Sequence, residues 1–140
     1  MAIEVVSKQR LVSVDRDCIR DLATGALASV GRAAASLTVA LVSDRRIREL
    51  NLRFRGKPQS TDVLSFPAGE SFATDYLGDI VISTKTAARQ AKDAGHTVER
   101  EVSELVIHGV LHLCGYDHET DQGEMNRLEL KLRRKLLDKS

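Results

Sequence analysis

The stretch HGVLHLCGYDH at residues 108–118 holds three of the four histidines in the chain. His108 and His112 are four residues apart, so on a helix they stand one turn apart on the same face. Gly115 is predicted to end this helix, because glycine readily adopts the left-handed conformation of a helix stop. The turn that follows can bring His118 back toward the pair. Three imidazole ligands with a fourth position open are typical of a catalytic metal, most simply zinc.

The histidine cluster has one alternative interpretation without a metal, in which the histidines act by acid–base chemistry alone. A zinc protease has a glutamate directly after the first histidine as its general base, whereas this chain has Gly109. Glycine cannot activate water, so the sequence disfavours metalloprotease chemistry. The candidates for the base are Asp117, Glu119 and a metal-bound hydroxide. Asp117 and Glu119 can also orient a metal ligand, or be ordinary solvated turn residues.

Other polar residues near the histidines have both a functional and an ordinary interpretation. Glu101 and Glu104 precede His108 by seven and four residues, so they share its helix face. They either line the rim of a cleft and orient His108, or form a solvated first turn of the helix. Cys114 is interpreted as a small buried residue and His96 as an ordinary surface residue of a loop.

Arg55 is the second candidate site residue. It follows Phe54, which is predicted to bury with Ile47 and Leu50 along one helix face, and it precedes a loop marked by Gly56. A guanidinium held there can bind phosphate bidentately or stabilise charge in a transition state, although an ordinary solvated charge is the alternative.

Basic residues gather in two regions although the net charge of the chain is only +1. These regions favour a polyanion such as RNA over a peptide. Aromatic residues make up 4% of the chain and Trp is absent, so aromatic stacking platforms for single-stranded nucleic acid are not expected. The first region contains Arg45, Arg46, Arg48, Arg53, Arg55 and Lys57, and the second contains Lys131, Arg133, Arg134, Lys135 and Lys139.

The composition predicts a soluble globular protein with one domain over residues 1–140. Its two cysteines, Cys18 and Cys114, are far apart and form neither a disulfide framework nor a four-thiolate zinc site. Neither an apolar run of membrane-spanning length nor a secretory signal is present, so we expect a cytoplasmic location.

Hydrophobic patterning predicts helices interleaved with about four strands, which is an α/β or α+β fold. Strands are predicted over residues 36–42, 62–66 and 77–83, the last of them central in its sheet. Short β-type patterns lie at 3–5 and 11–14, on either side of a polar break at 7–10. Helices are predicted over about 15–31, 44–54, 84–94, 97–114 and from 121 onward. The first helix is expected to bury a stripe spaced by four residues: Cys18, Leu22, Ala26 and Val30. Asp121 and Glu124 are expected to cap the last helix.

Three stretches together resemble the YbeY endoribonuclease family. They are HGVLHLCGYDH at 108–118, LGDIVIS at 77–83, and NLRFR at 51–55 followed by STDVLSFP at 60–67. The resemblance implies one α/β domain with a small mixed sheet packed by helices. It also implies one Zn²⁺ per chain held by His108, His112 and His118, on a helix and the following turn, and an RNA-binding or catalytic role for Arg55.

The activity implied by the resemblance is a zinc-dependent, single-strand-specific endoribonuclease. Such an enzyme would act in maturation of the 3′ end of small-subunit (16S) ribosomal RNA and in ribosome quality control. The implied partners are ribosomal RNA, the small ribosomal subunit and a GTPase of ribosome assembly. Two other functions stay open on the residues themselves: a metallopeptidase-like hydrolase, and a non-catalytic ribosome-assembly factor that contains zinc.

Overall fold

The computed structural model describes residues 3–69, 75–117 and 121–138. Within these residues the chain forms five helices and a four-stranded mixed sheet, which confirms the predicted α+β class. The elements in chain order are β1 (Ile3–Ser7), α1 (Arg16–Ser29), β2 (Ser36–Val42), α2 (Asp44–Arg55), β3 (Val63–Pro67), β4 (Tyr76–Ser83), α3 (Thr84–Ala94), α4 (Val98–Leu113) and α5 (Glu124–Leu136).

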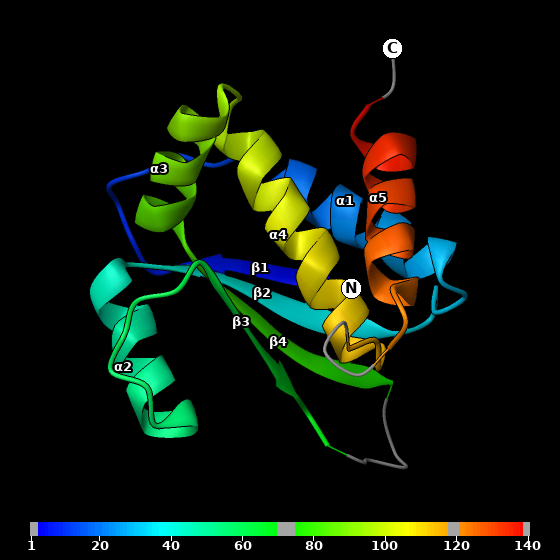
Figure 1. Cartoon of the computed structure of the whole chain (residues 1–140), viewed down its shortest axis with the longest axis horizontal. Helices are drawn as coiled ribbons and strands as arrows, with labels where there is room; N and C mark the ends of the chain where they lie inside the picture. The colour runs from blue at the N-terminus through cyan, green and yellow to red at the C-terminus, as the bar shows by residue number, and fades with distance from the viewer. Residues whose placement is uncertain (1–2, 70–74, 118–120, 139–140) are drawn as a thin grey trace.

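The strands lie in the order β1-β2-β4-β3 (Figure 1). β1 and β2 pair in parallel, as do β2 and β4, whereas β3 runs antiparallel to β4. β4 is therefore central, as its near-continuous apolar end predicts. β3 forms one edge of the sheet and contacts α4 there.

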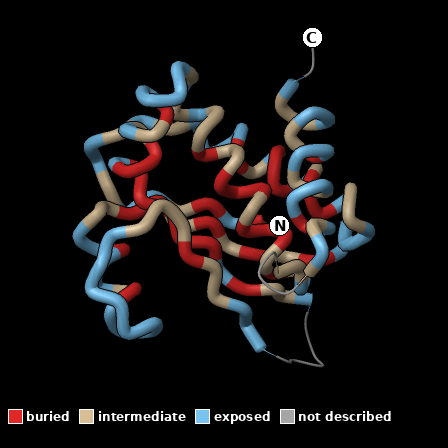
Figure 2. The backbone as a smooth tube through the Cα atoms, viewed as in Figure 1, coloured by how far each residue is buried: buried red, intermediate tan, exposed pale blue. Residues whose placement is uncertain are grey.

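The two faces of the sheet are covered unequally (Figure 1). The larger core lies on the face that carries α1, α4 and α5, and it includes Val39 of β2 and Ile80 of β4. The smaller core lies on the opposite face, where Ile47 of α2 packs against Leu64 and Val81. Figure 2 shows that buried residues concentrate on the sheet and on α4. α4 is thus fixed against the sheet, which gives the histidines a rigid support.

Two details of the predicted pattern are wrong. Residues 11–14 form no strand, and Leu11 is 85% exposed. Cys18 is also exposed, and α1 buries Ile19, Leu22, Ala23, Ala26 and Leu27. A strict spacing of four drifts around a helix of 3.6 residues per turn, so the buried residues instead fall at i, i+3, i+4, i+7 and i+8.

Phe54 also departs from its predicted burial, since it is 59% exposed. It stands at the last turn of α2, where it meets the Phe66 ring edge-on, with 5.4 Å between the ring centroids. None of the described helices is long and apolar enough to cross a membrane.

Candidate active-site cleft and metal centre

α4 presents the histidine pair as the sequence predicts. The helix begins after Thr97, whose side-chain oxygen accepts a hydrogen bond from the backbone N–H of Arg100. His108 and His112 lie on one face, with their ring centroids 4.7 Å apart and their planes inclined by 70°. The helix ends at Leu113, and Gly115 follows with φ of +99°, a conformation that favours glycine.

The two histidines line a cleft of about 440 Å³ between α4 and the edge of the sheet. Its lining brings together segments that are far apart in sequence: Arg55 at the end of α2, Thr61 and Asp62, Val63 to Ser65 of β3, His108 and His112 of α4, and Asp117. The predicted site residues Arg55, His108 and His112 therefore share one cleft.

Chain topology explains how Arg55 reaches a site built by α4. α2 packs on the opposite face of the sheet, but its last residue leads through a short loop into the edge strand β3. Buried Asn51 holds this loop by donating a hydrogen bond from Nδ2 to the carbonyl of Gln59, at 2.8 Å. Gly56 allows the chain to turn, with φ of +69° directly after the helix. Arg55 therefore lies where the chain passes around the open edge of the sheet.

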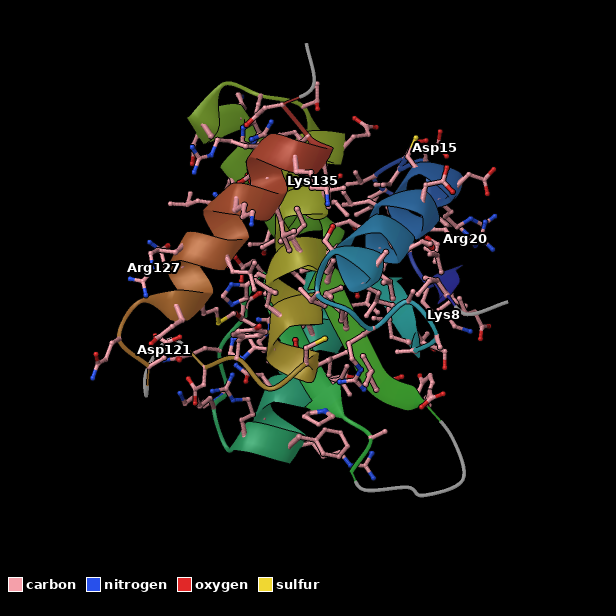
Figure 3. All side chains as sticks on the ribbon, turned by 90° about the vertical axis from the view of Figure 1, so that its right-hand side faces the viewer. Lys8, Asp15, Arg20, Asp121, Arg127 and Lys135 are labelled. Carbon is pink, nitrogen blue, oxygen red and sulfur yellow. The ribbon has the colours of Figure 1, made fainter. Side chains whose placement is uncertain are left out.

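His118 and Glu119 lie outside the described residues, so the third predicted ligand and one predicted base stay predictions. Within the described ranges, which stop at 117 and resume at 121, no three His, Cys, Asp or Glu side chains form a group that could hold a metal. Asp117 lines the cleft, and its carbonyl accepts a hydrogen bond from the backbone N–H of Asp121 at 3.1 Å. The turn after α4 is therefore tied to the start of α5, at the end marked by Asp121 in Figure 3.

Glu129 of α5 is a further residue at the site, and the sequence offers no signal for it. Its Oε1 lies 2.7 Å from Nδ1 of His108, and its side chain is only 12% exposed. Burial raises the pKa of Glu129, but the hydrogen bond with His108 and the Arg133 guanidinium outweigh this and hold the pKa below its usual range. A carboxylate is therefore present beside the ring, and it depends on the packing of α5 against α4.

The donor chemistry of the pair fits a zinc ion. Two imidazoles on one helix face open into the same cleft. The carboxylate of Glu129 engages Nδ1 of His108, which leaves Nε2 as the nitrogen suited to a metal. Neutral imidazole nitrogens are ordinary zinc ligands, and a site completed by a third histidine would keep a position open.

Glu101 and Glu104 take neither of their predicted roles. Glu101 pairs with His96, whose Nε2 lies 2.7 Å from the carboxylate, so His96 is not an ordinary surface residue. Glu104 accepts a hydrogen bond from Arg100 at 2.7 Å and faces Arg133 at 3.4 Å. Their side chains are 13% and 15% exposed, so Glu104 lies in a partly buried ion pair and Glu101 in a partly buried contact with His96. The carboxylate that meets Nδ1 of His108 is that of Glu129.

Gly109 lies on the buried side of α4, directly over β4. A Cβ atom at this position would come within 2.8 Å of Cγ2 and 2.9 Å of Cδ1 of Ile80. The side chain that acts as base in zinc proteases therefore has no room here, which adds a steric reason to disfavour protease chemistry. Cys114 is half-buried against the larger core, where burial raises the pKa of its thiol.

Replacing Gly109 by alanine is expected to destabilise the protein. Overpacking of a dense core costs about 1–3 kcal/mol, which exceeds the gain of about 1 kcal/mol in helix propensity. We expect a net loss in the free energy of unfolding, measured by urea denaturation. Gly25→Ala in α1 is the matched control, because its Cβ would meet only Cδ2 of Leu136, at 3.1 Å. If Gly109→Ala is as stable as Gly25→Ala, the close approach of α4 to β4 is refuted.

Known proteins match the chain over almost its whole length. The family model of endoribonuclease YbeY matches residues 4–138. An "Endoribonuclease YbeY" from Aquifex aeolicus is 47% identical over 116 residues, which cover 82% of this chain and 77% of the relative. Another from Sulfurihydrogenibium is 38% identical over 138 residues, covering 97% and 88%. A solution structure from Thermotoga maritima has a TM-score of 0.68 at 29% identity, covering 97% of this chain and 89% of that one.

The fold and the cleft define a small α+β protein with histidines and an arginine gathered at the edge of a mixed sheet. The chain belongs to the endoribonuclease YbeY family. This membership supports an endoribonuclease role, that of a hydrolase acting on RNA.

Proposed function

We propose that this protein is a zinc-dependent, single-strand-specific endoribonuclease. The observation that carries the proposal is the cleft itself, where Arg55 lies with His108 and His112 although α2 and α4 pack on opposite faces of the sheet. Imidazoles suit a metal and a guanidinium suits a phosphate, so the cleft combines both functions needed to cleave a phosphodiester. His118 is proposed as the third metal ligand.

Each residue of the cleft has a proposed role. His108 and His112 would hold the metal, with His118 as the proposed third ligand. A zinc ion bound there would supply Lewis acidity to a phosphate oxygen or to water. Arg55 binds the scissile phosphate and neutralises the charge that develops on its oxygens during cleavage. Asp117 lines the same cleft and is one candidate for the group that accepts the proton, with Glu119 as the other acidic candidate.

Two nucleophiles are compatible with this cleft, and their products differ. Attack by water leaves a 5′-phosphate on the downstream fragment and does not require a ribose. Attack by the 2′-hydroxyl of the RNA leaves a 2′,3′-cyclic phosphate and spares DNA. The chemistry of the product ends, determined by mass spectrometry of a cleaved oligonucleotide, distinguishes the two.

The exposed end of α2 provides a surface for the RNA backbone beyond the cleft. Arg48, Arg53, Arg55 and Lys57 are exposed and form no ion pair with a described residue, whereas Arg45 and Arg46 pair with Glu49. Cations near a cleft attract a polyanion and lengthen the binding track. The proposed substrate is the 3′ end of small-subunit ribosomal RNA, with the small subunit and an assembly GTPase as proposed partners.

Replacing Arg55 by alanine is expected to reduce cleavage of a single-stranded RNA by about 10²–10³-fold, as for the loss of one transition-state donor. Folding should be preserved, because exposed side chains contribute within about 0.5 kcal/mol of stability. The assay measures single-turnover cleavage, with metal content and melting temperature checked in parallel. Arg53→Ala is the matched control, since it removes the same charge two residues away but outside the cleft, where the guanidinium lies over the Phe54 ring. It should weaken RNA binding only slightly, as one cation of the surface, and leave the single-turnover cleavage rate of bound RNA nearly unchanged.

Two outcomes would contradict the proposed enzyme. Undiminished cleavage by Arg55→Ala would show that Arg55 takes no part in RNA cleavage. A second pattern would favour the non-catalytic assembly factor, in which zinc removal unfolds the domain while Arg55→Ala leaves RNA binding and processing intact.

A further inference from the structure

Glu129 connects the candidate metal centre to a network of charged side chains between α4 and α5. One carboxylate oxygen engages Nδ1 of His108, and the other accepts a hydrogen bond from Arg133 one turn further along α5. Arg133 in turn faces Glu104 of α4 at 3.4 Å. α4 and α5 lie side by side in both views (Figures 1 and 3). The side chains of the four residues in this network, His108, Glu129, Arg133 and Glu104, are each at most 29% exposed.

The contact with His108 selects one form of the imidazole ring. An ionised carboxylate can only accept hydrogen bonds, so Glu129 requires a proton on Nδ1 of His108. A neutral ring with its proton on Nδ1 has its lone pair on Nε2. The ring is also held in one orientation, because the hydrogen bond comes from a helix that is packed against α4.

Arg133 holds Glu129 in place for this role. A partly buried carboxylate is costly unless it is paired and hydrogen-bonded, and the guanidinium supplies a second bond to it. Because Arg133 is also near Glu104, it is anchored from α4 as well as from α5. Arg133, which the sequence predicts as part of a basic region for RNA, thus lies in an ion-pair network between α4 and α5.

We propose that Glu129 is a positioning residue for the metal centre: it fixes the tautomer and orientation of His108 so that Nε2 faces the metal. This inference rests on the proposed zinc site, and it assigns to α5 a part in metal binding. The competing explanation is that Glu129 is one more ion pair that joins α5 to α4. The two explanations differ in what the loss of Glu129 does to zinc affinity at constant stability.

The test compares two glutamine variants of the full-length protein. Glu129→Gln keeps the shape of the side chain, but its amide can turn to donate to Nδ1 and so favour the wrong tautomer. Glu104→Gln is the matched control, because it removes a similarly buried carboxylate beside Arg133 and leaves in place the carboxylate that meets Nδ1 of His108. Zinc affinity is measured by competition with a chromogenic chelator, and stability by urea denaturation.

We expect Glu129→Gln to weaken zinc binding by about 10–100-fold, as is typical when a group that is hydrogen-bonded to a metal ligand is removed. Glu104→Gln should leave zinc binding nearly unchanged. A second readout is ¹⁵N NMR of the zinc-loaded protein, in which the Nδ1–H of His108 should be protected from solvent exchange in the wild type and in Glu104→Gln. This protection should be lost in Glu129→Gln. An ion pair with only a structural role would not change either readout selectively.

Each other outcome overturns the inference. Equal loss of zinc affinity in both variants would show that Glu129 only joins the helices, and unchanged affinity in Glu129→Gln would show that it does not position His108. Absence of zinc binding by the wild type would overturn the proposed metal centre as well. If Glu129→Gln does not fold, the double variant Glu129→Gln/Arg133→Met, which leaves no unpaired buried guanidinium, is measured against Arg133→Met alone.

Discussion

Replacing His112 by alanine is expected to remove both bound zinc and RNA cleavage while the protein stays folded. Structural zinc sites contribute about 10–16 kcal/mol from four ligands, so one ligand corresponds to roughly 3 kcal/mol, or more than a hundredfold in affinity. The side chain is only partly buried on the cleft wall, so its removal opens no cavity in the core. Elemental analysis after dialysis and cleavage of a single-stranded RNA measure the two losses.

His96→Ala provides the control for this variant. His96 is the one histidine outside the 108–118 stretch, and it pairs with Glu101 near the start of α4. The His96→Ala variant should keep wild-type zinc content and cleavage, and loss of the contact with Glu101 should lower its stability only slightly. Equal cleavage by the wild type, His112→Ala and Arg55→Ala would indicate a contaminating nuclease and refute the proposed enzyme.

Replacing Gly78 by alanine is expected to cause the largest loss of stability. Gly78 has φ of +139°, and a Cβ there would lie 2.2 Å from the carbonyl oxygen of Phe66 and 2.9 Å from the amide nitrogen of Ala68. These are backbone atoms of the segment paired with β4, so relief requires β3 to separate from β4 at this end. Strain of about 1–3 kcal/mol and lost hydrogen bonds of about 1 kcal/mol each give a total near 3 kcal/mol or more.

Urea denaturation measures this loss, and Gly95→Ala separates its two causes. Gly95 also has a positive φ, +75°, but a Cβ there would meet no described atom within 4 Å. Gly95→Ala should lower the free energy of unfolding by about 1–2 kcal/mol, which is the cost of a left-handed backbone at a residue with a Cβ atom. Because β3 lines the cleft, Gly78→Ala should also slow RNA cleavage, whereas Gly95→Ala should not. Similar losses of stability in both variants would contradict the steric role of Gly78.

Local patterns predict the elements of this fold well. Alternating branched and smaller residues predict β2, and a near-continuous apolar run predicts β4. Residues of types that favour helix starts, Ser43 and Thr97, cap α2 and α4. The pattern fails where burial depends on distant partners. The apolar segment that contains Leu11 pairs with no strand among the described residues. Phe54, at the last turn of α2, meets the Phe66 ring of the edge strand β3 and stays 59% exposed.

The last helix shows the same limit at its start. Asp121 and Glu124 are predicted to cap it reciprocally, but the helix begins after Gly123, which has φ of +97°. Asp121 instead accepts hydrogen bonds from the backbone N–H groups of Gly123 and Met125. The residue types that cap a helix are visible in the sequence, but which N–H they meet depends on how the turn is placed by its neighbours.

The sequence by itself determined the histidine pair, since a spacing of four and a helical period of 3.6 place His108 and His112 on one face whatever surrounds them. It also determined that a helix stop follows, because Gly115 takes a conformation other residues avoid. Tertiary structure decided that Arg55 joins the histidines, through the edge strand that follows α2. It also decided that the carboxylate meeting Nδ1 of His108 comes from Glu129 of α5. Contacts between elements depend on packing, which local periodicity does not encode.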